Sequence, residues 1–199
     1  GRFKDQIVPV TVKSRKGETV VDTDEQPGKG RPDKIPELKP AFARDGTITA
    51  ASSSSISDGA AAVVLTRQST AQAKGLAPVA TLAGLAAHSQ EPAAFSTAPV
   101  GAIRKVLDQA GWSIEDVDLF EVNEAFACVA MFAMRDLGIP HEKVNVNGGA
   151  TALGHPIGAS GTRIVTTLIA ALKARGLKRG VASLCIGGGE ATAVALELV

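Results

Sequence analysis

Three short segments carry polar side chains that a purely structural fold would not require at those points. They cover residues 121–126, 145–161 and 183–190. Each follows or contains the end of an apolar run typical of a buried strand, and ligands of open α/β sheets bind at the carboxyl ends of strands. We therefore take Asn123, His155 and Cys185 as the starting candidates for a functional site.

The first segment, Glu-Val-Asn-Glu-Ala-Phe, lies between a predicted strand and a predicted helix. One interpretation is structural: Asn123 would cap the helix, and Glu124 would lie favourably in its first turn. The other gives the amide of Asn123 a role at a ligand site. On this segment alone the structural interpretation is favoured.

The second segment holds five glycines around His155, which lies just before a predicted helix. A helix N-terminus disfavours the imidazolium, so the ring would stay neutral and could donate a hydrogen bond or take a proton. A phosphate-binding loop is the rival interpretation, but no Gly-Lys-Ser/Thr and no G-x-G-x-x-G is present. A plain glycine-rich turn with a solvated histidine explains the glycine density less well.

In the third segment Cys185 ends an apolar strand and is followed, after Ile186, by three glycines. It is either an inert buried thiol or a thiol that meets a substrate beside bare backbone N–H groups able to hold an oxyanion. The segment does not decide between the two. Cys128 lies in mid-helix among apolar residues and is assigned to the core. We expect both cysteines to be reduced, and their spacing fits no zinc site, so no metal is expected.

The elements that must position these residues alternate between strands and helices. Strands are predicted at residues 79–86, 117–122, 144–146, 181–186 and 192–198, and helices at 100–110, 125–137 and 161–174. Earlier in the chain we predict an edge strand within 7–12, a buried strand at 58–65 and a helix at 69–74. This pattern predicts an α/β protein with a mixed five-stranded sheet whose last two strands form a hairpin.

Composition removes several functional classes. The net charge is +1 and aromatic residues make up only 4%, which argues against a nucleic-acid partner. No apolar run reaches membrane-spanning length, and no signal peptide is recognisable, so no membrane partner is expected.

Together the three segments resemble the thiolase family, which includes acetyl-CoA acetyltransferases and 3-ketoacyl-CoA thiolases. Residues 123–126 match its N-E-A-F motif, residues 147–161 its N-G-G-A…G-H-P-x-G-x-S-G signature, and residues 185–189 its C-x-G-G-G. The motifs occur in family order, and the match runs over most of the chain. The resemblance is to the C-terminal half of the family.

The resemblance implies the thiolase fold, with helices on both faces of the mixed sheet. Residues 1–56 would be the tail of the loop domain that covers coenzyme A. Residues 57–77 would be the last strand and helix of the N-terminal domain, and residues 78–199 the C-terminal domain.

It also implies an acyl-CoA C-acyltransferase. The reaction is reversible thiolytic cleavage of 3-ketoacyl-CoA, or Claisen condensation of acetyl-CoA, and runs by a ping-pong mechanism through an acyl-cysteine. That cysteine belongs to the N-terminal half, so this chain alone is expected to be inactive. Coenzyme A and acetyl-CoA are substrates, and no tightly bound cofactor is implied.

Roles carry over where positions match. His155 would activate the nucleophile, Cys185 would move a proton to and from the substrate, Asn123 would hold a water of the first oxyanion hole, and the Gly187 N–H would serve the second. Ser54, Ala50 and Phe126 would line the pantetheine channel.

The family further implies a homo-oligomer, either a dimer or a tetramer, acting in fatty acid metabolism. We expect a cytoplasmic protein of bacterial type, with an organellar matrix as the alternative. Separated from its twin, the domain would expose apolar surface and would not be a stable monomer. Two other functions stay open: a non-catalytic coenzyme A-binding module, and a self-contained acyl hydrolase that uses Cys185 and His155.

Overall fold

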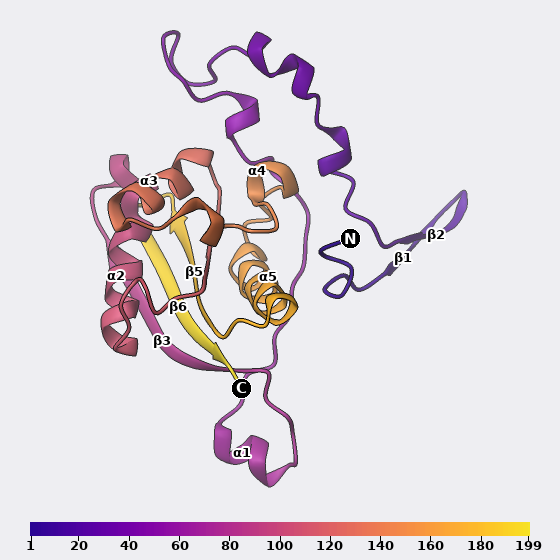
Figure 1. Cartoon of the computed structure of the whole chain (residues 1–199). Coiled ribbons are helices and arrows are strands. Elements are labelled where there is room, and N and C mark those ends of the chain that lie inside the picture. Colours follow the sequence, from indigo (N-terminus) through magenta and orange to yellow (C-terminus); the bar gives the residue numbers. More distant parts are fainter.

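The computed structural model describes residues 1–199, and its centre is a mixed four-stranded sheet with the order β3-β6-β5-β4 (Figure 1). The strands are β3 (Ala80–Ser89), β4 (Leu119–Val122), β5 (Arg179–Ile186) and β6 (Glu190–Leu198). β6 is antiparallel to both β3 and β5, whereas β4 runs parallel to β5. The predicted α/β class, the mixed sheet and the terminal hairpin are confirmed.

Helices cover both faces of this sheet. α2 (Ala98–Ala110) and α3 (Ala127–Leu137) cover one face and α5 (Ser160–Arg175) covers the other, while the short α4 (Ala150–Leu153) precedes α5. Successive strand residues point to opposite faces, so in β4 Phe120 joins the core under α2 and α3, while Leu119 joins the core under α5. The sheet therefore packs against two apolar cores, one on each of its faces.

Three helices end on a glycine in the left-handed conformation. Gly111, Gly138 and Gly176 follow α2, α3 and α5 with φ of 67°, 68° and 65°. A residue without Cβ adopts this conformation at no steric cost, so these glycines suit the ends of the helices.

The fifth strand, predicted at residues 144–146, is wrong: only a single bridge joins Val144 to Phe120. The backbone leaves the extended conformation at Asn145, where φ is 47°. The Asn145 side chain then replaces strand pairing, because it accepts from the Val122 N–H and donates to the Val122 carbonyl, both at 2.8 Å. An amide side chain thus completes the edge of β4.

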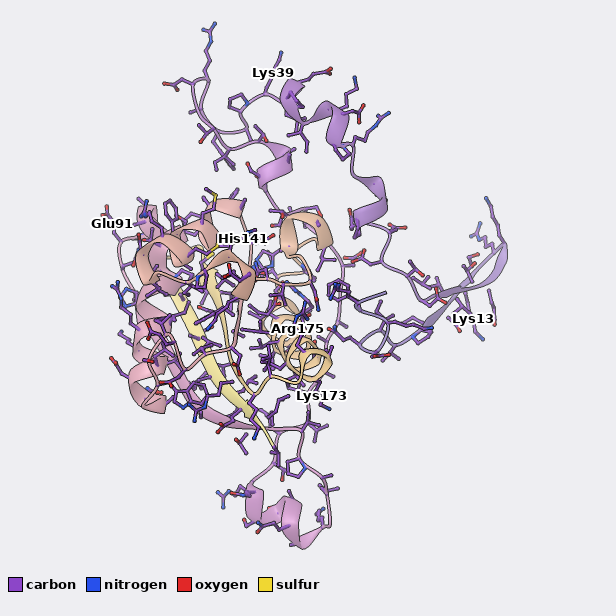
Figure 2. The ribbon with its side chains drawn as sticks, in the orientation of Figure 1. Lys13, Lys39, Glu91, His141, Lys173 and Arg175 are labelled. Carbon is purple, nitrogen blue, oxygen red and sulfur yellow. The ribbon has the colours of Figure 1, made fainter.

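The first part of the chain lies apart from the sheet. It contains the hairpin β1 (Val10–Ser14) and β2 (Gly17–Val21), and α1 (Gln68–Ala73) follows later. Short 3₁₀ turns occur in this first part at Pro27–Lys29, Pro32–Glu37 and Ala50–Ser52. Two more, at Pro92–Thr97 and His141–Lys143, connect elements around the sheet. Figure 2 shows Lys13 and Lys39 on this first part, well away from the sheet.

The buried strand predicted at residues 58–65 is also wrong. This segment forms no strand, and Val64 and Leu65 are 93% and 72% exposed. A strand needs a neighbour to satisfy its backbone groups, and no strand of residues 1–199 lies beside this one. Its apolar composition is left without a partner within the chain.

Asn145 gives a test of how the edge of β4 is completed. Asn145→Ala leaves two buried backbone groups of Val122 unpaired and strains the positive φ, so it should lower the free energy of unfolding by about 2–4 kcal/mol. Asn145→Gly relieves only the strain and should recover about 1 kcal/mol. Urea unfolding followed by circular dichroism measures both values, and an Ala variant as stable as the wild type would refute this role.

Candidate active site

The parallel pairing of β4 with β5 brings two of the motifs to one edge of the sheet. Val122 lies opposite Ser183, and the Asn123 N–H donates to the Ser183 carbonyl at 2.9 Å. Cys185 lies two residues further along β5. Asn123 and Cys185 therefore both lie at the carboxyl ends of adjacent strands, where ligands of such sheets bind.

Asn123 does not cap the following helix. α3 begins at Ala127, and its N-cap residue is Phe126, without a side-chain capping bond. The Asn123 side chain is buried instead, with Nδ2 3.4 Å from Nε2 of His155 and Oδ1 3.4 Å from Nη2 of Arg163. The structural interpretation of this residue is therefore wrong, and its amide faces the imidazole of the second motif.

His155 lies in the connection between α4 and α5 and is held from both sides. Its backbone N–H donates to the Ser55 carbonyl at 2.9 Å, and its Nδ1 lies 2.5 Å from the Ser160 hydroxyl. Ser160 donates in turn to the Pro156 carbonyl at 3.0 Å. Burial, and then the positive charge of Arg163, lower the pKa of His155 below its ordinary value of 6.5. The ring is therefore neutral near pH 7 and can take a proton.

The glycines of the second motif allow close packing around this loop. A Cβ on Gly149 would strike the Glu124 carboxylate, and one on Gly154, where φ is +86°, would strike the Ser57 hydroxyl. Glu124 accepts hydrogen bonds from the Asn145 side chain at 2.8 Å and from the Thr151 hydroxyl at 2.6 Å. The glycines thus leave room for the Glu124 carboxylate, which fixes the loop. A bound phosphate is not needed to explain why the loop has so many glycines.

Cys185 is a buried thiol in the core cluster under α2 and α3. Burial raises its pKa to about 11, and the nearby Cys128 adds to this effect. No hydrogen bond joins the thiol to His155 or Asn123. A cysteine nucleophile needs a stabilised thiolate, and this environment disfavours one.

The turn after Cys185 presents a free backbone donor. The Gly187 N–H has no hydrogen-bond acceptor in the chain, and a Cβ at this residue would meet open space. Gly189, with φ of +98°, approaches the Gln90 carbonyl too closely to carry a Cβ, and its own carbonyl accepts from the Gln90 N–H at 3.0 Å. The turn is therefore fixed at its far end and open at Gly187.

Two of the three residues predicted to line the pantetheine channel come together. The Ser54 hydroxyl donates to the Ala125 carbonyl at 3.0 Å, which places it beside Phe126. The Phe126 ring packs edge-on against Phe42 and Phe95, with centroids 5.8 and 6.2 Å away. Ala50 is exposed in the turn that precedes Ser54.

Sequence reasoning missed two charged residues behind Asn123. Glu121 is 1% exposed, and burial raises its pKa to about 8, an effect opposed by Arg163 and Arg175 and reinforced by Glu124. Glu121 Oε1 and Arg163 Nη1 are buried without a hydrogen-bond partner. The available signal was Glu121 itself, a carboxylate in the otherwise apolar run Leu-Phe-Glu-Val.

Residues 1–199 contain neither a cluster of metal-binding side chains nor a membrane-spanning helix. No group of three or more His, Cys, Asp or Glu side chains in residues 1–199 could hold a metal ion. None of the helices combines the length and the apolar character needed to cross a bilayer.

Family models match almost the whole chain. The thiolase C-terminal domain matches residues 76–198, and the thiolase N-terminal domain matches residues 1–69. The chain belongs to the thiolase family. It is 50% identical to an acetyl-CoA acetyltransferase of Paracoccus denitrificans over 99% of its length, which is 51% of that relative. A probable acetyl-CoA acetyltransferase of Dictyostelium discoideum is 52% identical over 99% of this chain and 48% of its own length.

Solved thiolase structures share the fold. The acetyl-CoA acetyltransferase of Bacillus anthracis has a TM-score of 0.96 and 46% identity, over the whole of this chain and 51% of the other. Human mitochondrial 3-ketoacyl-CoA thiolase in complex with CoA has a TM-score of 0.89 and 37% identity, over the whole of this chain and 50% of its own. The chain thus spans about half the length of the thiolases that it matches.

The buried carboxyl of Glu121 predicts a pH-dependent stability. Its pKa is about 8 in the folded chain against 4.5 for a free carboxyl, so folding favours the protonated form. Its stabilising contribution is complete below pH 4.5 and is lost as the pH rises to 8, with a slope of at most about 1.4 kcal/mol per pH unit.

Urea unfolding across this pH range measures the effect. Glu121→Gln should flatten the slope, whereas Glu142→Gln, at an exposed carboxylate, should leave it unchanged. Equal slopes for the wild type and Glu121→Gln would contradict the burial of an unpaired carboxyl.

Proposed function

We propose that this chain is the C-terminal half of an acyl-CoA C-acyltransferase, which cleaves 3-ketoacyl-CoA or condenses acetyl-CoA. The observation that carries the proposal is the contact between the Asn123 amide and the imidazole of His155, 3.4 Å apart at the end of β4. It pairs a neutral base with an amide at the point where a thioester oxygen would gain charge. Relatives with about half of their residues identical are acetyl-CoA acetyltransferases.

In this proposal His155 serves the first half-reaction. Its Nε2 takes the proton of a nucleophilic cysteine, whose sulfur then bonds to the acyl carbon while the bond from that carbon to the coenzyme A sulfur breaks. The proton returns from His155 to the departing thiolate. A water that Asn123 holds stabilises the thioester oxygen, and His155 itself helps to hold that oxygen.

Cys185 serves the second half-reaction. Its thiol, with a pKa raised to about 11, exchanges a proton with groups that are themselves weak acids, namely the substrate α-carbon and the thiol of coenzyme A. The free Gly187 N–H, two residues further on, donates to the oxyanion formed in this step.

The nucleophilic cysteine is assigned to a preceding half of the protein. An apolar groove runs between the segment at residues 63–68, the start of β3 and the outer face of α5, with Val63, Leu65, Leu76, Val165 and Ile169 among its lining residues. We assign this groove to the preceding half, whose strand would also pair with residues 58–65. We also propose that the chain is divided into the loop-domain tail at residues 1–56, the end of the N-terminal domain at 57–77 and the C-terminal domain at 78–199.

Coenzyme A is placed along the first part of the chain. Relatives from human mitochondria and Ascaris suum have been solved in complex with CoA. Ser54, Ala50 and Phe126 would line the pantetheine arm, and the segment at residues 1–56 would cover the nucleotide. No tightly bound cofactor is required, because the acyl group rests on the protein.

The same proposal covers the assembly and the setting of the enzyme. We propose a homo-oligomer, a dimer or a tetramer, that acts in fatty acid metabolism. The compartment is the bacterial cytoplasm, or an organellar matrix.

The two alternative functions have less support. A self-contained hydrolase needs an activated Cys185, but its thiol pKa is raised and it has no hydrogen bond to His155. A non-catalytic coenzyme A-binding module would not need the neutral base and the amide that face one another at His155 and Asn123.

The proposal predicts that this chain alone does not thiolyse acetoacetyl-CoA, and that mixing it with the preceding half restores turnover. In the assembled enzyme, His155→Asn should lower kcat by about 100- to 10,000-fold because the general base is lost. His141→Asn, at an exposed histidine, is the matched control and should retain activity.

Assays of thiolysis, of acyl-CoA hydrolysis and of coenzyme A binding distinguish the three functions. Hydrolysis of an acyl-CoA by the isolated chain that disappears in Cys185→Ser would establish the hydrolase. Coenzyme A binding without turnover in any mixture would favour the binding module.

A further inference from the structure

The buried guanidinium of Arg163 lies behind the pair formed by Asn123 and His155 and has no part in the steps described above. Arg163 is in the first turn of α5, and its Nη2 lies 3.4 Å from Oδ1 of Asn123. Guanidinium groups only donate hydrogen bonds, so the oxygen of the Asn123 amide must face Arg163. The amide nitrogen then faces His155.

This orientation fixes the tautomer of His155. The Asn123 Nδ2 is a donor and lies 3.4 Å from His155 Nε2, so Nε2 must accept. Nδ1 therefore carries the proton and donates to the Ser160 hydroxyl, which donates to the Pro156 carbonyl at 3.0 Å. Each link from Arg163 Nη2 to the Pro156 carbonyl then has one donor and one acceptor, and the lone pair of the imidazole lies on Nε2.

Arg163 lies near two carboxyl groups, those of Glu121 and Glu124. Burial lowers the pKa of the Arg163 guanidinium, and the nearby carboxyl groups of Glu121 and Glu124 act in the opposite direction. Glu121 and Arg163 form no direct ion pair, and each keeps one buried polar atom without a partner. Buried groups of this kind do not raise stability by themselves, so a role at the neighbouring site explains their presence better.

We propose that Arg163 is a positioning residue that sets the orientation of the Asn123 amide and thereby keeps the proton of His155 on Nδ1 and its lone pair on Nε2, the atom that acts as the base. The inference rests on the proposed function of His155. It adds a specific tautomer and the residue that selects it.

The test uses the assembled enzyme with ¹⁵N-histidine only in this chain, which has 3 histidines. In the wild type, two-bond ¹H–¹⁵N correlation spectra should show His155 protonated at Nδ1, with His155→Asn assigning the signal. Arg163→Met frees the amide to rotate, so a mixture of both tautomers should appear. The kcat of thiolysis should fall by up to about 100-fold with little change in KM. Arg135→Met, at an exposed guanidinium paired with Asp136, should change neither.

A second variant keeps the inference testable if Arg163→Met does not fold. Asn123→Asp has nearly the same shape but presents only acceptors, so it should move the proton of His155 to Nε2 and raise the pKa of the ring. An unchanged Nδ1 tautomer in the folded variants would overturn the inference. Turnover that persists in His155→Asn would instead defeat the proposed function, so the two failures are distinguishable.

Discussion

The parallel pairing of β4 with β5 is the contact on which the candidate site depends. It sets Val122 opposite Ser183 and ties the Asn123 N–H to the Ser183 carbonyl at 2.9 Å. Because both strands point the same way, their ends deliver an amide and a thiol to one edge of the sheet. α5 packs on this strand pair and carries Ser160 and Arg163 in its first turn, so one helix end contacts both Asn123 and His155.

The two groups to which we assign proton transfer, His155 and Cys185, are both uncharged near neutral pH. Burial lowers the pKa of His155 and raises that of Cys185 to about 11, so imidazole and thiol are both neutral near pH 7. A neutral base and a neutral weak acid suit exchange of protons with thiols and with carbon acids, which are weak acids as well. It does not suit a thiolate that waits to attack, and the acyl group is therefore assigned to a cysteine outside this chain.

The sequence predicted the periodic elements well, because their local pattern and their packing agree. α2, α5 and β6 lie within two residues of their predicted bounds, and a left-handed glycine ends each of the long helices. The errors share a physical cause, which is that strand pairing depends on a neighbour outside the local sequence. Residues 58–65 have a strand composition but no neighbouring strand, and at Asn145 a side chain replaces the strand pairing that the apolar pattern suggested.

The site was predictable where its motifs are contiguous. Asn123, His155 and Cys185 were identified by residue type and position, although the contact between Asn123 and His155 joins residues 32 positions apart and could only be seen in the fold. The sequence analysis did not identify Arg163, because nothing in the local sequence marks an arginine in the first turn of a helix as part of a site. Only the approach of β4 to α5 shows that its guanidinium faces the Asn123 amide.

The central claim is that this chain supplies the base and the second thiol while the acyl group rests elsewhere. Peptide mass spectrometry of the assembled enzyme, quenched with acid after incubation with acetyl-CoA, tests it most directly. The account predicts an acetyl group on a cysteine of the preceding half and an unmodified peptide around Cys185. An acetyl group on Cys185 itself would contradict the account.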